Sequence, residues 1–248
     1  MLTKKIVKYI QSLNLKKFRD EEGEFIAEGP KVVGEFLLSK NFEPRIICAE
    51  KNWLFDNAIL LKEIDSGNIF EVDENDMSRL SQLKTPNKVV AIFAKNALIQ
   101  APGLEKQLTL MLDDLQDPGN LGTIIRIADW FGIKNIICSE NSVECYNPKV
   151  VQSTMGSLDR VNIFYSDLFS FMNSHQEIPV YAAALSGKSI FEMGKITEGI
   201  ILIGNESQGI HPDILKLSTH KVNIPRVGGA ESLNAAVAAG IIVSHFVR

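Results

Sequence analysis

Cysteine is scarce in this chain: its 248 residues include only three, and these are scattered. Cys138 and Cys145 lie too far apart for a C-x-x-C pair, and no group of histidines stands beside them at metal-ligand spacing. The sequence therefore excludes a disulfide framework and a zinc finger, and we expect no metal site. Buried free thiols in a reducing compartment are the expectation for all three cysteines.

Long apolar runs and an excess of positive charge are also missing. The longest apolar stretch, residues 235–247, is too short to span a bilayer and contains Ser244 and His245. Residues 1–18 carry charges on both sides of a broken apolar pattern, unlike a signal peptide. The formal net charge of −4 means that any contact with a polyanion must come from a local patch. We therefore expect a cytoplasmic protein.

Short apolar runs alternate with helical segments along the chain, first up to residue 94 and again after residue 107. Residues 95–107 are polar and contain Pro102 and Gly103, which is typical of a linker. The later apolar runs are 108–112, 135–139, 161–165, 179–184, 200–204 and 220–224. This alternation predicts a small α/β domain (1–95), a linker (96–106) and a second α/β domain (107–248) with a mostly parallel sheet. The final helix is predicted over residues 232–247, with Ser232 as its N-cap.

One segment, AAALSGKS, imitates a Walker A phosphate loop, with Gly187, Lys188 and Ser189 in the expected places. A Walker A loop also needs a long helix that begins at the lysine. The sequence that follows, KSIFEMGKITEGI, is short and interrupted by glycine. A surface turn is the favoured interpretation, and a P-loop nucleotidase is one alternative function.

Polar side chains follow three of the later apolar runs, and these are Asn120 with Arg126, Glu206, and Ser232 with Asn234. The first turn lacks the G-x-G-x-x-G spacing of a dinucleotide site. Taken singly, each group has an ordinary interpretation: Asn120 caps a helix, Arg126 is solvated, and the rest form turns and a cap. Open α/β sheets bind ligands at the carboxyl ends of their strands, so the three junctions together favour a functional site.

Three segments occur in a characteristic order: NLGTIIRIADWFG, LIGNESQGI and IPRVGGAESLNAAVAAGI. Through them the chain resembles the SpoU (TrmH-like) branch of the SPOUT class of RNA ribose methyltransferases. The segment EFIAEGPKVVGEFL resembles the start of the family's small substrate-binding module. The resemblance implies a C-terminal α/β SPOUT domain with a parallel sheet and a deep trefoil knot, which is an exception to the rule against threaded chains. A small, ribosomal-protein-like α/β domain that binds substrate would precede it.

The resemblance also implies an activity, the transfer of a methyl group from S-adenosylmethionine to a ribose 2′-hydroxyl. The expected substrate is RNA, with ribosomal RNA favoured over transfer RNA, and no DNA or membrane partner is expected. A homodimer would form through the knotted domain, with the active site near the interface. The alternative within the family is a catalytically inactive knotted protein that binds RNA or assists assembly.

Ten residues match the family's functional positions: Arg126, Asn120, Glu206, Ser232 and Asn234 for catalysis, and Gly204, Asn205, Ile224, Leu233 and Ala184 for the cofactor. Arg126 is the candidate for activating the hydroxyl. A guanidinium has a pKa above roughly 12 and no acceptor when charged, so positioning of a phosphate or hydroxyl is an equal alternative. Glu206 is expected to orient Asn120 or Arg126 through charge-assisted hydrogen bonds.

Two sets of basic residues are candidates for RNA contacts. The first is an N-terminal cluster formed by Lys4, Lys5, Lys8, Lys16, Lys17 and Arg19. A solvated helix face is the alternative there, since three acidic residues follow at once. The second set, an alternative to the first, is Lys149 with Arg160, which would line the catalytic cleft.

Overall fold

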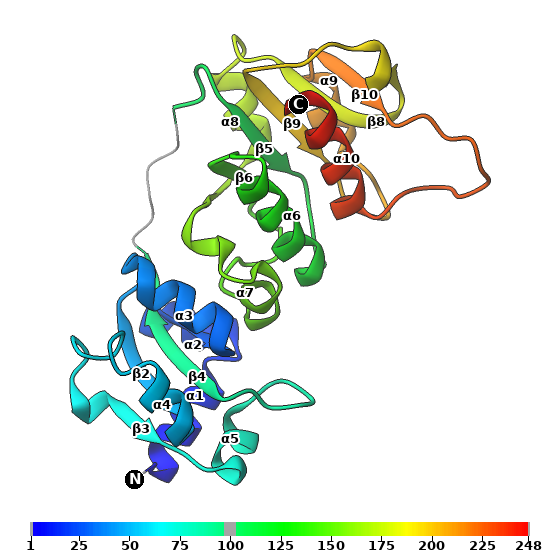
Figure 1. Cartoon of the computed structure of the whole chain (residues 1–248). Helices are drawn as coiled ribbons and strands as arrows, with labels where there is room; N and C mark the ends of the chain where they lie inside the picture. The colour runs from blue at the N-terminus through cyan, green and yellow to red at the C-terminus, as the bar shows by residue number, and fades with distance from the viewer. Residues whose placement is uncertain (1, 97–102, 248) are drawn as a thin grey trace. The chain divides into compact units, whose positions relative to one another are not determined.

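The computed structural model describes residues 2–96 and 103–247. The chain forms two compact units, one of Met1–Ala97 with Tyr146–Asp159 and one of Leu98–Cys145 with Arg160–Arg248 (Figure 1). Most of the linker expected at 96–106 lies outside the described residues. Each unit is described below by itself.

The first unit is built on a four-stranded sheet in the order β1-β4-β2-β3. Its strands are β1 (Glu24–Glu28), β2 (Pro44–Ala49), β3 (Ile69–Glu71) and β4 (Val89–Ala94). Strand β4 is antiparallel to β1 and β2, while β2 and β3 are parallel. Its helices are α1 (Lys4–Ser12), α2 (Lys16–Glu22), α3 (Pro30–Ser39), α4 (Lys51–Asp56), α5 (Glu74–Leu80) and α7 (Pro148–Thr154), with short 3₁₀ turns at Ser66–Asn68 and Ser157–Asp159.

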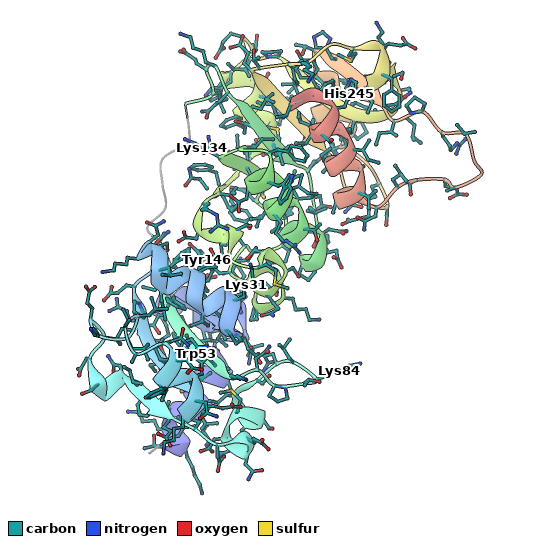
Figure 2. All side chains as sticks on the ribbon, in the orientation of Figure 1. Lys31, Trp53, Lys84, Lys134, Tyr146 and His245 are labelled. Atoms are coloured by element: carbon teal, nitrogen blue, oxygen red, sulfur yellow. The ribbon has the colours of Figure 1, made fainter. Side chains whose placement is uncertain are left out.

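A cluster of aromatic rings forms part of the core of this unit, and one ring comes from much later in the chain. Phe25 of β1 packs edge-on against Phe42, with ring centroids 5.2 Å apart. Tyr146 lies 4.7 Å from Phe25, and its hydroxyl accepts the amide of Asn96 at 3.3 Å. Figure 2 labels Tyr146 among the side chains of the structure. Burial of such rings is a major part of core stability, so Tyr146 completes this core.

The segment 146–159 is bound to the first unit at its other end as well. The hydroxyl of Ser39, at the end of α3, donates to the carboxylate of Asp159 at 2.6 Å. A side chain at Gly156 would lie 2.8 Å from the Cβ of Glu35, so α3 and this segment are in close contact. The division predicted from sequence places residues 146–159 in the second domain, 107–248. Packing instead places this one segment in the first unit.

The second unit contains a six-stranded sheet in the order β10-β8-β9-β5-β6-β7, and every neighbouring pair is parallel. Its strands are β5 (Leu108–Leu112), β6 (Asn135–Ser139), β7 (Asn162–Ser166), β8 (Val180–Ser189), β9 (Gly199–Ile203) and β10 (His220–Asn223). Its helices are α6 (Pro118–Trp130), α8 (Leu168–Ser174), α9 (Pro212–Lys216) and α10 (Ala235–Val247), with a 3₁₀ turn at Ile190–Glu192. The prediction of an α/β fold with a parallel sheet is confirmed.

Helices cover both faces of this sheet, which explains why its central strands are apolar throughout. Helices α6 and α10 pack against each other, while α8 and α9 also contact each other (Figure 1). Side chains of α8 and α9 join those of β5, β6 and β9 in one buried cluster. All five residues of β5 and of β9 are buried, as strands covered on both faces require. Among the described residues, no helix has the length and apolarity to cross a membrane.

Two helix starts differ from the prediction. Helix α10 begins at Ala235, and its N-cap is Asn234, whose Oδ1 accepts the amides of Ala236 and Val237 at 2.9 and 3.2 Å. The prediction of Ser232 as the N-cap is therefore wrong. Helix α6 is capped by Asp117, which accepts the amide of Asn120 at 2.8 Å, ahead of a proline in its first turn. The Asn120 side chain is thus free for another role.

Candidate active site

The carboxyl ends of β8, β9, β10 and β5 meet at one edge of the second unit's sheet, because these strands are parallel neighbours. Ala184 lies in β8, and Gly204 and Ile224 follow directly after β9 and β10. The register of β10 jumps from Ala182 to Lys188, so residues 183–187 have no partner on that strand. Three of the five residues expected to hold the cofactor therefore share this edge.

A chain of three side chains crosses the site. Asn120 in the first turn of α6 donates from Nδ2 to Oε1 of Glu206 at 2.7 Å. Asn234 donates from Nδ2 to Oδ1 of Asn120 at 2.8 Å. Asn120 is only 9% exposed, so both ends of its amide are satisfied within the protein. The structure thus joins residues that lie 86 and 114 positions apart in sequence.

This chain fixes the orientation of each member. Glu206 can only accept when ionised, so it holds the NH₂ end of Asn120 and turns the amide oxygen toward Asn234. Asn234 then uses its own oxygen to cap α10. A carboxylate has about four acceptor positions, so Glu206 keeps capacity for a further donor. The network can therefore position a further donor, either a hydroxyl of the substrate or the side chain of an arginine.

Arg126 and Ser232 are not joined to this network. Arg126 is exposed on α6 and makes no hydrogen bond or ion pair with the residues that the structure describes. It follows Asn120 by six residues, which places the two side chains about 120° apart around the helix and roughly 9 Å apart along it. Ser232 is exposed, and Leu233 is 47% exposed, in the loop that precedes α10.

The loop after β9, residues 204–211, is closely packed and carries Glu206. A side chain at Gly204 would lie 2.3 Å from main-chain atoms of Gly209 and Ile210, so only glycine fits. Asn205 pairs with Gly209 through both main-chain groups, at 3.0 and 2.9 Å. The Asn205 side chain also holds the loop together, accepting the amide of Ser207 at 2.8 Å. Its expected contact with the cofactor stays a prediction.

Sequence reasoning did not single out Asp113, which lies directly after β5. This carboxyl group is 5% exposed and accepts the amide of His211 at 2.7 Å. Burial raises the pKa of Asp113, although the hydrogen bond from His211 acts in the opposite direction. A charged residue immediately after a buried strand was the available signal for a role at this edge.

The Walker-like segment does not form a phosphate loop. Lys188 and Ser189 lie in β8, where they pair with Val222 and Asn223 of β10. A side chain at Gly187 would lie 2.4 Å from the amide nitrogen of Val222. This glycine is required for close strand packing, and a three-residue 3₁₀ turn follows where a P-loop needs a long helix. The P-loop alternative is therefore excluded.

The segment between β10 and α10 runs out from the sheet and returns to it (Figure 1). Its residues 225–234 are exposed, with Val227 fully so, and Leu185 of β8 is also 78% exposed. Exposed apolar side chains beside main-chain groups of a glycine-containing loop suit an adenosine, which has a flat apolar ring and a hydrogen-bonding edge. The residues present therefore fit S-adenosylmethionine.

Two of the basic residues considered for RNA binding are engaged in the protein. Arg19 is 2% exposed and donates to the carbonyl groups of Leu13 and Asn14 at 2.8 and 2.9 Å, so it belongs to the core of the first unit. Arg160 forms a bidentate ion pair with Asp129, through Nε and Nη2. The Arg19 part of the basic-cluster prediction is wrong, because a buried guanidinium cannot reach a phosphate.

The second unit is therefore an α/β fold whose candidate site residues gather on loops at the carboxyl edge of a parallel sheet. Residues 107–244 match the SpoU rRNA Methylase family, and residues 4–91 match the MRM3-like substrate binding domain. The chain therefore belongs to the SpoU rRNA methylase family, as its motifs indicated.

Similar proteins are known along nearly the whole chain. A Bacillus subtilis protein named 23S rRNA (guanosine(2553)-2′-O)-methyltransferase RlmP is 29% identical, with 96% of this chain and 94% of that protein covered. A structure of a TrmH-family protein from Porphyromonas gingivalis is 36% identical, with a TM-score of 0.85 over 99% and 98% of the two chains. An AdoMet-bound rRNA methyltransferase from Sinorhizobium meliloti is 30% identical, with a TM-score of 0.87 over 99% and 95%.

Proposed function

We propose that the protein transfers a methyl group from S-adenosylmethionine to a ribose 2′-hydroxyl of ribosomal RNA. The reaction class follows from family membership: the protein is an S-adenosylmethionine-dependent RNA 2′-O-methyltransferase. Ribosomal RNA is chosen because the Bacillus and Sinorhizobium relatives are named for it. The observation that carries the proposed site is the hydrogen-bonded chain of Asn234, Asn120 and Glu206 at the sheet edge.

The cofactor would be held by Ala184, Gly204, Ile224 and Leu233, whose loops share or border that edge. When bound, it supplies a methyl group on a sulfonium centre. The protein's own contribution is orientation: Glu206 and Asn120 hold the polar groups around the hydroxyl, and alignment of reacting groups supplies much of an enzyme's rate. Arg126 would bind the phosphate or hydroxyl of the attacked nucleotide, since its guanidinium is always charged.

Mapping 2′-O-methyl groups in ribosomal RNA from a deletion strain tests this function. We expect one site methylated in the parent to be unmethylated in the deletion strain, and methylation to return on complementation. Purified protein should also methylate ribosomal RNA taken from the deletion strain. An unchanged ribosomal map with a lost transfer RNA site would contradict the choice of substrate. No lost site in either RNA, with no cofactor binding by calorimetry, would favour the inactive RNA-binding alternative.

We further propose the C-terminal knot. Two contacts support it, both between the last turn of α10 and the connection from β8 to β9. The amide of Ile196 donates to the carbonyl of Phe246 at 3.1 Å, and Nε2 of His245 lies 3.1 Å from the carbonyl oxygen of Met193. A chain threaded through an earlier loop would bring its terminal helix and that loop into contact in this way.

A homodimer that shares its active sites is also proposed. Arg126 points away from Asn120 on the same helix, and among the described residues no lysine or arginine forms an ion pair with Glu206. The packed helices α6 and α10 carry exposed apolar side chains, Trp130 at 78% and Val237 at 50%. A second copy would cover them and supply its Arg126 to the site.

Mixing two variants with severely lowered activity tests the shared site. In a dimer of one Arg126→Ala chain and one Glu206→Gln chain, one of the two sites has both residues intact. After random exchange of chains, we expect about a quarter of wild-type methyl transfer. Each variant alone, handled in the same way, is the control. No recovery, with chain exchange verified by tagged copies, would show that Arg126 serves its own chain.

For RNA binding we propose the end of the first unit's sheet where β1 stops and β4 starts. Lys31, Lys84 and Lys88 are exposed there and make no ion pair with described residues. Gly29 donates its amide to the carbonyl of Val89 at 2.9 Å, which brings the start of α3 next to the loop 81–88. Lys84 points away from the sheet at the tip of that loop (Figure 2). Unpaired lysines are suited to RNA phosphates.

Charge reversal of two of these lysines tests the surface. We expect Lys31→Glu with Lys84→Glu to raise the KM for ribosomal RNA roughly tenfold, with kcat unchanged, because phosphate contacts supply affinity rather than chemistry. The matched control is Lys62→Glu, an exposed lysine in the connection between α4 and β3. An equal effect of the control, or no change in KM, would place the RNA elsewhere. The N-terminal lysines would be tested next.

A cytoplasmic location stays a prediction. It is supported by Cys48, Cys138 and Cys145, which are all buried and outside any disulfide, as the sequence predicted.

A further inference from the structure

We propose that Asp113 and Asn205 are positioning residues that hold the Glu206 carboxylate in place for methyl transfer. This inference rests on the proposed role of Glu206. In the described part of the chain neither side chain forms a hydrogen bond with Glu206 itself, and both act on the loop that carries it. Together they tie the loop 204–211 to the end of β5, and we name these two contacts the latch.

The first contact of the latch is made by Asp113. Its carboxylate accepts the amide of His211 at 2.7 Å, at the far end of the loop. Its own amide continues the sheet by donating to the carbonyl of Ile203 at 2.9 Å, just before the loop begins. Asp113 therefore holds both ends of the loop, from a position that is 5% exposed. Removing its oxygens would leave the partly buried amide of His211 without this partner.

The second contact is made by Asn205. Its Nδ2 donates to the carbonyl of Asp114 at 2.7 Å, while its Oδ1 accepts the amides of Ser207 and Gln208 at 2.8 and 3.1 Å. Asp114 has a φ of 54°, a left-handed conformation that asparagine and aspartate tolerate better than most residues. One side chain thus shapes the turn with its oxygen and anchors it to β5 with its nitrogen.

The latch determines where Glu206 can reach. Glu206 lies between the two anchored ends of the loop, and its partner Asn120 belongs to α6, which begins five residues after Asp113. The positions of Glu206 and Asn120 are therefore both fixed relative to the same short segment at the end of β5. A shift of about 1 Å in such a group can lower an enzymatic rate as much as a hundredfold.

The two functions of Asn205 can be separated by substitution. Asn205→Asp keeps an oxygen for the amides of Ser207 and Gln208 but has no NH₂ group for the carbonyl of Asp114. Asp113→Ala removes the acceptor for His211, whereas Asp113→Asn keeps one. We expect Asn205→Asp and Asp113→Ala to lower kcat roughly tenfold to a hundredfold on ribosomal RNA from the deletion strain, and Asp113→Asn to recover most of it. The matched control is Glu140→Gln, an exposed carboxylate that lines the same cleft of about 400 Å³ as Asp113 and forms no hydrogen bond or ion pair with the described residues of the loop.

A double-mutant comparison separates positioning from general stability. In a Glu206→Gln background, Asn205→Asp should lower kcat by less than about twofold, because the group it positions is already gone. A full additional loss in that background would overturn the proposal, as would wild-type kcat in both single variants. A Glu206→Gln variant with wild-type kcat would contradict the proposed function itself, which is a separate outcome on a separate protein.

Hydrogen exchange gives a readout that does not depend on activity. The Asp113 carboxylate protects the amide of His211 directly, and the bond from Asn205 to Asp114 restrains the loop that contains the amides of Ser207 and Gln208. Peptides covering 204–211 should therefore exchange faster in Asn205→Asp and Asp113→Ala. Exchange in β5 and α6 should be unchanged, and the Glu140→Gln control should match wild type throughout. If Asp113→Ala does not fold, Asn205→Asp alone decides: unchanged exchange in the loop would overturn the latch.

Discussion

Replacing Arg126 with alanine is expected to lower methyl transfer by at least about a hundredfold while leaving S-adenosylmethionine binding unchanged. Removal of one well-placed hydrogen-bond donor from an active site has an effect of this size. Cofactor binding should persist because Arg126 is exposed on α6, whereas the proposed cofactor residues lie on the loops after β8, β9 and β10. Calorimetry with the cofactor and transfer of labelled methyl groups to ribosomal RNA measure the two quantities separately.

The control for this experiment comes from the same helix. Thr123 is exposed on α6 one turn earlier, and its hydroxyl donates only to the carbonyl of Gly119, at 2.8 Å. Thr123→Ala should keep wild-type activity. Arg126→Lys should retain part of the activity if charge matters most, and very little if the planar fork binds a phosphate or hydroxyl. Wild-type turnover in Arg126→Ala would show that Arg126 has no role in the active site.

The second large effect is expected from Gly204→Ala. The new Cβ would lie 2.3 Å from the carbonyl carbon of Gly209 and 2.5 Å from its oxygen, and these main-chain atoms cannot move without breaking the pairing of Asn205 with Gly209. We expect the free energy of unfolding to fall by about 1–3 kcal/mol, as for other overpacked sites. Affinity for S-adenosylmethionine should fall more than about tenfold, which corresponds to about 1.4 kcal/mol.

Thermal unfolding and calorimetry on the same protein preparation measure these changes. Gly194→Ala is the matched control, because a side chain there would meet nothing within 4 Å. It should leave both the melting temperature and the cofactor affinity unchanged. A Gly204→Ala variant with wild-type values for both would show that the loop 204–211 is less closely packed than described.

The buried strands were the part of the fold that sequence predicted best. Residues 108–112 and 135–139 were expected as strands and are β5 and β6, because a parallel strand covered on both faces must be apolar throughout. The helix starts were less certain for a physical reason. Ser232 and Asn234 are both good N-caps, and the choice between them depends on a tertiary contact, the bond from Asn234 to Asn120.

The polar site was predicted residue by residue but not as an arrangement. The motifs named Asn120, Glu206 and Asn234, and the structure joins them in one chain. The six-residue spacing turns Arg126 away from Asn120 on α6, but the sequence could not tell that Asn120, rather than Arg126, would meet Glu206 and Asn234. Asp113 was missed because a single charged residue after a strand is too common a pattern to indicate a latch. Arg19 was misplaced because its partners are main-chain carbonyl groups, which leave no signature in a sequence.

The aromatic core of the first unit has a consequence for synthesis on the ribosome. Residues up to 97 leave the ribosome first and contain the sheet of that unit, but the ring of Tyr146 that packs on Phe25 does not yet exist. Domains generally fold as units during translation, and exposed apolar surface in the interval favours aggregation. The first unit can reach its final core only after residues 146–159 have emerged, when part of the second unit has already been made.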